Sequence, residues 1–238
     1  MVLWQGINFT ADGHEPTTAE EYYRIALHCW NSDPHRPATT FFLETAAATG
    51  HPAAVELLGH VRYVQGQYAD AVPWLRQSPG SPRAAYYLAT LSHHGCPPAG
   101  VAPSLDDAAH WYRAAASLGE PEAMLALADL YLERQLPVTR TPADHALELL
   151  LTAADGGHPY AQYRAAELYR TLYGDTGRAA ALYRACLDNP MTPRHALATL
   201  MTLQSQAHLR EITANQAYQQ RQQRGDALNP PHRRDDFY

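Results

Sequence analysis

Apolar side chains recur at helical spacing in short segments of this chain, and polar residues bound each segment. Between positions 108 and 116 the apolar residues follow the i, i+3, i+4 pattern of an amphipathic helix. A second set, between 123 and 131, does the same after a short break. Two such helices joined by a tight turn must pack antiparallel, so the pattern predicts helix pairs. The two sets are Ala108, Trp111, Tyr112, Ala115 and Ala116, then Ala123, Leu127, Leu130 and Tyr131.

A Gly-x-Pro triplet, followed shortly by alanine, separates the two segments of each predicted pair. Glycine tolerates the left-handed conformation that ends a helix, and proline suits the first position of the next one, where its missing N–H costs nothing. Between them, Ser81 is a natural N-cap, and the charge of Glu120 suits a helix N-terminus. The triplets are Gly50-His51-Pro52, Gly80-Ser81-Pro82, Gly119-Glu120-Pro121 and Gly157-His158-Pro159.

The sequences around the triplets repeat. The fourth copy aligns with the third at a uniform offset of 38 residues, for example Ala153 with Ala115. The second copy is abbreviated, because two residues are missing before Gly80. A degenerate fifth copy begins near Ala180. Stacked repeats of this kind bury a continuous core between neighbours, so we expect an all-α solenoid of about five antiparallel helix pairs.

The two ends differ from the repeats. Residues 17–31 are predicted to form a capping helix that begins at Thr17 or Thr18, with Glu20 and Glu21 in its first turn. We therefore divide the chain into an N-terminal segment with its capping helix (1–36), helical repeats (37–203), a C-terminal helix (204–224) and a flexible tail (225–238).

The stretch DDAAHWYRAAASLGEPEAMLALADLYLE, residues 106–133, resembles the Sel1-like repeat, a relative of the tetratricopeptide repeat. The preceding connector, HHGCPPAGVAPSLDDAA, is similar to the glycine- and valine-containing connector of that family. The resemblance covers roughly residues 37–189. It implies a right-handed α-solenoid with N- and C-terminal capping helices, of a kind that usually serves as an adaptor or assembly scaffold and in some cases acts in bacterial signalling or secretion.

Charge narrows the range of partners. The net charge is -6, and all 18 basic residues are arginine. A chain without a basic stripe is poorly suited to binding nucleic acid. A basic protein surface, in contrast, would be steered toward this acidic chain. Cys29, Cys96 and Cys186 are widely spaced and odd in number, which favours a reducing compartment. The start of the sequence lacks a secretory signal, and no stretch approaches 18 apolar residues, so we expect a cytoplasmic protein without membrane insertion.

Catalytic and cofactor motifs are absent from the sequence. It contains no Gly-x-Ser-x-Gly elbow, phosphate loop, dinucleotide fingerprint or HExxH. His93, His94 and Cys96 lie together in one connector, but no second ligand pair has the spacing of a zinc site. The acid pair Asp106-Asp107 is explained by its place at a helix start. We therefore expect no enzyme activity, no cofactor and no metal.

The first helix of each pair commonly lines the concave, partner-binding face of such arrays. Two neighbouring rows of equivalent positions run along these helices, and one must face inward while the other faces outward. One row is Glu44, Arg76, Arg113, Leu151 and Arg184, and the other is Leu43, Leu75, Tyr112, Leu150 and Tyr183. As the contact surface we predict Arg76, His110, Arg113, Tyr183 and Arg184.

These observations favour a protein–protein interaction scaffold. Short stand-alone arrays of the resembled family often occur in toxin and secretion systems, so the resemblance implies a bacterial immunity protein, or an adaptor or chaperone, that binds a toxin or secreted effector. Three alternatives stay open at this point: a signalling regulator, a receptor for an extended peptide such as the chain's own tail, and a hydrolase with an unrecognised cleft.

Overall fold

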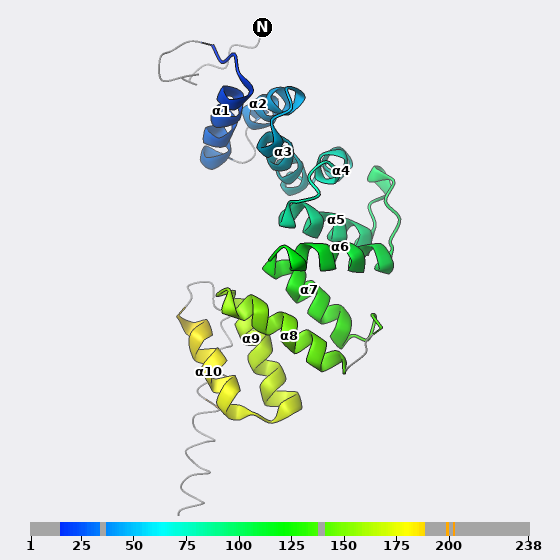
Figure 1. The fold of residues 1–238 in the computed structure, drawn as a ribbon, viewed down its shortest axis with the longest axis vertical. Coiled ribbons are helices and arrows are strands. Elements are labelled where there is room, and N and C mark those ends of the chain that lie inside the picture. The colour runs from blue at the N-terminus through cyan, green and yellow to red at the C-terminus, as the bar shows by residue number, and fades with distance from the viewer. Residues whose placement is uncertain (1–14, 34–36, 138–140, 189–198, 200–201, 203–238) are drawn as a thin grey trace, which may run out of the picture. The chain divides into compact units, whose positions relative to one another are not determined.

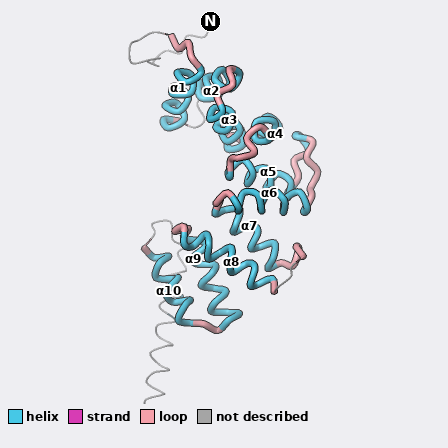
Figure 2. The backbone as a smooth tube through the Cα atoms, viewed as in Figure 1, coloured by secondary structure: helices cyan, strands magenta, loops and turns pink. Residues whose placement is uncertain are grey.

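The computed structural model describes residues 15–33, 37–137, 141–188, 199 and 202 of the 238-residue chain. Within these residues the regular structure is helical (Figures 1 and 2), which confirms the all-α fold class. The helices are α1 (Ala19–Ser32), α2 (Pro37–Ala48), α3 (Pro52–Val64), α4 (Tyr68–Arg76), α5 (Pro82–His94), η1 (Pro97–Ala99), α6 (Leu105–Ser117), α7 (Pro121–Leu132), α8 (Pro142–Asp155), α9 (Pro159–Leu168), η2 (Tyr169–Tyr173) and α10 (Thr176–Leu187).

The described residues fall into two compact units, which are divided between Gly156 and Gly157. In the first unit each helix from α1 to α8 packs against the next one along the chain, and in the second unit α9 packs against α10. The predicted repeats therefore appear as the helix pairs α2–α3, α4–α5 and α6–α7, with α8, α9 and α10 following in the expected order. The predicted C-terminal helix and tail lie outside the described residues.

The N-terminal capping helix begins where the sequence indicated. Thr18 is the N-cap of α1, and its hydroxyl accepts a hydrogen bond from the Glu21 backbone N–H at 3.3 Å. The Glu21 carboxylate in turn accepts one from the Thr18 N–H at 3.0 Å. These two bonds satisfy backbone donors that a helix start leaves without a partner.

Two of the Gly-x-Pro turns share one backbone geometry. After α2, Gly50 donates to the Ala47 carbonyl at 2.9 Å and His51 to the Ala46 carbonyl at 3.2 Å. After α6, Gly119 and Glu120 donate to the equivalent carbonyls, both at 3.0 Å. The glycines have φ of +83° and +90°, as this left-handed helix ending requires. Gly157, in the fourth triplet, also has a positive φ.

Gly80 departs from this pattern, and the expectation of a left-handed glycine is wrong there. Its φ is not positive, unlike that of the other three triplet glycines. The second repeat is two residues shorter, so α4 ends at Arg76 and the chain turns through residues 77–81 instead. The prolines behave alike in all four turns, because each opens the following helix at Pro52, Pro82, Pro121 or Pro159.

The middle residue of the triplet caps the next helix in three of the four turns. His51, Ser81 and His158 each accept a hydrogen bond from the backbone N–H three residues later. Glu120 makes no such cap. Its side chain is 6% exposed, and burial together with the neighbouring Glu122 raises its pKa to about 7. The cost of burying this charge therefore opposes the stabilisation that the sequence predicts for Glu120 at the helix start.

The core between helices is rich in small residues. Ala115 and Ala123 are fully buried in one cluster, where Trp111 and Tyr131 pack against them. A methyl group at Gly59 of α3 would lie 3.0 Å from Leu75 Cδ2 and 3.2 Å from the Leu75 backbone nitrogen in α4. Small side chains thus let neighbouring helix backbones approach closely, as the repeat pattern predicts.

We predict that Gly119→Ala destabilises the protein by about 1 kcal/mol or more, because a residue with a Cβ resists the left-handed conformation. A Cβ at Gly119 meets no atom within 4 Å, so backbone strain alone is being tested. Gly80→Ala is the matched control, since its surroundings are equally open and its φ is not positive. Urea unfolding of both variants measures the difference, and equal stabilities would refute the role assigned to Gly119.

A second prediction concerns Glu120. Because its pKa in the folded protein lies above its value of 4.5 in the unfolded chain, the folded state holds the proton more tightly. The stability from this group is therefore present below pH 4.5 and is lost as the pH rises through about 7. Glu120→Gln should raise the melting temperature at pH 8 and change it little at pH 4. The exposed Glu148→Gln is the control, and a Glu120→Gln effect independent of pH would contradict this account.

Candidate functional site

Equivalent positions on the first helices of the five repeats divide into a buried and an exposed row. The buried row is at most 3% exposed at every position, which confirms that one row faces inward. In the other row Leu151 is partly buried and the four charged residues are exposed. All five repeats therefore present the same helical register to the core. The buried row is Leu43, Leu75, Tyr112, Leu150 and Tyr183, and the exposed charges are Glu44, Arg76, Arg113 and Arg184.

Tyr183 is fully buried, which contradicts the prediction that it belongs to the contact surface. Its ring lies 5.9 Å from that of Tyr163, and its hydroxyl donates a hydrogen bond to the Glu167 carboxylate. Burial and this carboxylate raise the pKa of Tyr183. The reason is its register, since it occupies the tyrosine position of the buried row and so belongs to the core of the α9–α10 pair.

The other predicted contact residues are exposed. Arg76 ends α4, and His110 and Arg113 lie on α6, all in the first unit, whereas Arg184 lies on α10 in the second. The His110 ring meets the Trp111 ring edge to face, with centroids 5.3 Å apart. These side chains are therefore available to a partner, but none of them lines a hollow described below.

A cavity of about 230 Å³ lies between α1, α3 and α5 in the first unit. Half-buried aromatic side chains and a few charged groups surround it, and small and aliphatic side chains complete its wall. The aromatic and polar residues are Tyr23, His60, Tyr87, Glu56, Ser81 and Arg83, and the apolar ones are Ala53, Leu57, Leu75 and Ala84.

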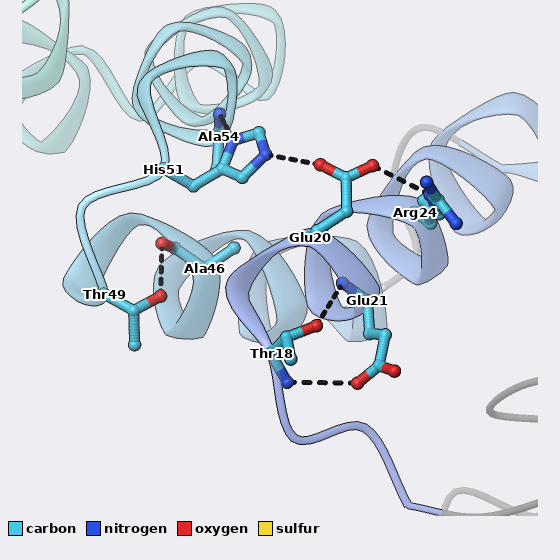
Figure 3. Close-up of polar contacts among 8 residues, drawn as sticks. All are labelled: Thr18, Glu20, Glu21, Arg24, Ala46, Thr49, His51 and Ala54. Atoms are coloured by element: carbon cyan, nitrogen blue, oxygen red, sulfur yellow. Dashed lines mark hydrogen bonds and ion pairs between the residues drawn. The ribbon is translucent and has the colours of Figure 1, made fainter.

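The α1 side of the cavity is held by a histidine that serves two helices. His51 Nδ1 accepts a hydrogen bond from the Ala54 N–H at 3.2 Å, so its Nε2 carries the proton and donates to Glu20 Oε2 at 3.0 Å (Figure 3). Hydrogen bonds from His51 and Arg24 lower the pKa of Glu20. The Tyr23 ring stacks on the His51 ring, with centroids 4.5 Å apart. The helix cap thereby positions a cavity residue.

The α3–α5 side is built from contacting rings. His60 meets Trp30 and Tyr87 edge to face, at centroid distances of 5.4 and 5.6 Å. Tyr87 also stacks on Tyr63 at 3.8 Å. Burial lowers the pKa of His60 and the charge of Arg83 lowers it further, while the carboxylate of Glu56 acts in the opposite direction. This wall is a fixed aromatic surface.

A second, wider hollow of about 450 Å³ adjoins the cavity, because the two share Ala53, Glu56 and Ser81. They meet where the Ser81 hydroxyl donates to Glu56 Oε1 at 2.6 Å. The Ser81 hydroxyl oxygen also accepts a hydrogen bond from the Ala84 N–H and so caps α5. The wider hollow runs along the abbreviated turn, over Gln77, Ser78 and Gly80. The two hollows together form a groove across the starts of α3 and α5, which we call the α3/α5 groove.

Sequence reasoning missed this groove, since it favoured the first helix of each pair, whereas the groove lies on the second helices and on α1. One signal pointed there. Tyr86 and Tyr87 are consecutive aromatic residues of α5. Because consecutive side chains of a helix point in different directions, both cannot lie on its core face, and both remain only partly buried.

In the described part of the chain, no three His, Cys, Asp or Glu side chains are close enough together to hold a metal ion. His93 and His94 stack on each other at 4.7 Å at the end of α5, and Cys96 is buried. All three cysteines are buried, and they do not form disulfides with one another. Among the described helices, none has the length and apolar character needed to cross a membrane.

No family model and no curated protein sequence matches this chain. Solved structures do. A protective antigen of uropathogenic Escherichia coli with an SLR fold aligns at 24% identity and a TM-score of 0.60, covering 71% of this chain, which spans 38% of that protein. A Sel1 repeat protein from Oxalobacter formigenes aligns at 21% identity and 0.61, covering 73% of this chain and 74% of that one.

An immunity protein from Pseudomonas aeruginosa aligns less closely, at 23% identity and a TM-score of 0.45, over 77% of this chain and 71% of that one. The first two alignments support a helical repeat fold. The chain has the Sel1-like, tetratricopeptide-related repeat fold that its sequence resembles.

Proposed function

We propose that this protein is an interaction scaffold that binds another protein through the α3/α5 groove. The observation that carries the proposal is a concave surface lined by half-buried tyrosine and histidine rings with charged groups at its rim. Aromatic side chains are enriched at protein interfaces, because they offer a large apolar area and lose little conformational entropy on binding. The rings here are already fixed by contacts with one another, which lowers the cost of binding further.

Charge supports a basic partner. The described residues of the first unit include 16 aspartates and glutamates but only six arginines. Such a surface attracts a positively charged protein over long range and speeds their encounter. We propose a toxin or secreted effector as that partner, with this chain acting as its immunity protein or as its adaptor. The exposed residues Arg76, His110, Arg113 and Arg184 are proposed as secondary contacts outside the groove.

The groove also favours a receptor for an extended peptide segment. It consists of two adjoining hollows, and the Glu56–Ser81 hydrogen bond lies where they meet. A segment laid across this contact would place neighbouring side chains in the two hollows. The scaffold hypothesis and the peptide-receptor hypothesis thus involve the same surface. They differ in whether the bound segment of the partner is folded or extended.

Affinity capture tests the proposal. The tagged full chain is immobilised, a lysate of the native organism is passed over it, and bound proteins are quantified by mass spectrometry. We expect one partner to be enriched in near-stoichiometric amount. Glu56→Arg should reduce its recovery by about tenfold or more, because like charges at an interface are strongly unfavourable. Glu56 is exposed, so the variant is expected to fold, and its melting temperature verifies this.

Two further variants locate the contact. Glu148→Arg, on the exposed side of α8, makes the same charge change away from the groove and should leave recovery unchanged. The double variant Arg76→Glu/Arg113→Glu tests the secondary contacts and should have a smaller effect than Glu56→Arg. Enrichment of no protein above an unrelated bait would argue against the scaffold. Equal recovery by Glu56→Arg and the wild type would rule out the groove.

Co-expression separates the two proposed roles. A captured toxin that arrests growth when expressed alone should be neutralised by the wild-type chain and not by Glu56→Arg. An adaptor would instead raise the solubility or secretion of its partner without any toxicity to suppress. Loss of both effects in the wild type would contradict the toxin or effector assignment.

A further inference from the structure

We infer that the cavity between α1, α3 and α5 receives a positively charged side chain, an arginine or a lysine, from the bound partner. The inference rests on the proposed protein-binding function and names the chemistry that the cavity recognises. It concerns one half of the α3/α5 groove, the part enclosed by Tyr23, His60 and Tyr87.

Size points to a single side chain. At about 230 Å³ the cavity is smaller than the roughly 300–1,000 Å³ of typical small-molecule sites. Its wall combines apolar groups, including Ala53, Leu57 and Ala84, with aromatic rings. Arginine and lysine have this dual character, since an aliphatic stem carries a charged head. The stem would pack on the apolar part and the head would lie against the rings.

Aromatic rings attract cations through their electron-rich faces, within about 6 Å of the ring centre. Tyr23 and Tyr87 come from different helices, α1 and α5, and both border the cavity. His60 lies between Trp30 and Tyr87, and burial lowers its pKa, which disfavours a positive charge on its ring. The wall therefore offers rings to a cation, and a competing imidazolium is disfavoured.

The carboxylate of Glu56 supplies the complementary charge. It stands at the cavity rim, and its Oε1 is fixed by the Ser81 hydroxyl. Burial raises the pKa of Tyr23, and the carboxylates of Glu56 and Glu20 raise it further. The same field that opposes a negative phenolate at Tyr23 favours a positive guest beside it.

Arg83 is the one permanent cation among the described residues that line the cavity, and its charge would repel a positively charged side chain nearby. It is exposed on α5, where it interacts electrostatically with Glu120, the N-cap residue of α7, and with Tyr87 and His60. Glu120 and Glu122 act on Tyr87 in the opposite sense to Arg83. Glu122 therefore offsets part of the charge of Arg83 at Tyr87, whereas Tyr23 on the α1 side is influenced by the carboxylates of Glu56 and Glu20. The cation is expected on the α1 side, between Tyr23 and Glu56.

Titration with short peptides tests the inference on the full-length chain. The probes are Ac-Gly-Arg-Gly-NH2, its neutral isostere with citrulline, and Ac-Gly-Glu-Gly-NH2. Binding of each peptide is monitored in 1H–15N correlation spectra of the protein. The arginine peptide should give saturable shifts that cluster at the amides of Ala53, Leu57, His60, Ala84 and Tyr87. Citrulline should bind about two- to fivefold more weakly, as expected for an exposed cation–π contact, and the glutamate peptide should bind more weakly still.

Glu56→Gln is the decisive variant, because its amide oxygen can still accept from Ser81 while the charge is lost. It should weaken arginine binding about two- to fivefold, whereas Glu148→Gln should not. Equal binding of arginine and citrulline, stronger binding of the glutamate peptide, or shifts that avoid the cavity would overturn the inference. If these occurred while the captured partner still depended on Glu56, the proposed function would stand and only the cation assignment would fail.

Discussion

Helix backbones in the first unit approach one another closely at positions occupied by glycine and alanine, and the rest of the architecture depends on this contact. At Gly59 the space for a methyl group is already taken by Leu75 of the next helix. Ala115 and Ala123 are fully buried in one cluster of the third repeat. Close approach of this kind gives dispersion contacts along the whole backbone and leaves large side chains to fill the gaps between pairs. Trp111 and Tyr131 do so around the third repeat.

The candidate site follows from the same constraint. Ala53 and Ala84 open the second helices of two successive repeats, and being small they leave a hollow where α1, α3 and α5 come together. The shortened second repeat widens that hollow, because α4 ends early and the chain crosses residues 77–81 in an irregular turn. The groove is therefore a by-product of how the helices stack, and the tyrosines that border it are held by partners elsewhere in the core, such as His51 and Tyr63.

Local and periodic features were predictable from the sequence. The four prolines, the cap at Thr18, and the division between the Tyr112 and Arg113 rows all rest on spacing within one or two helices. The misses concern burial. The sequence does not show which of the two rows is buried, so the prediction of Tyr183 as a contact residue is wrong, and it does not show that Glu120 at the start of a helix is buried. The cavity joins residues from α1, α3, α4 and α5, which no periodic pattern relates to one another.

The buried and exposed rows on the first helices are adjacent in sequence, yet they are under different constraints. The inward position is leucine or tyrosine in all five repeats, whereas the outward one is glutamate, arginine, arginine, leucine and arginine. Because each repeat brings both positions with it, duplication or exchange of a whole repeat preserves the core contact and rewrites the surface beside it. An array built this way can diverge in its recognition chemistry in repeat-sized steps while its fold is inherited unchanged.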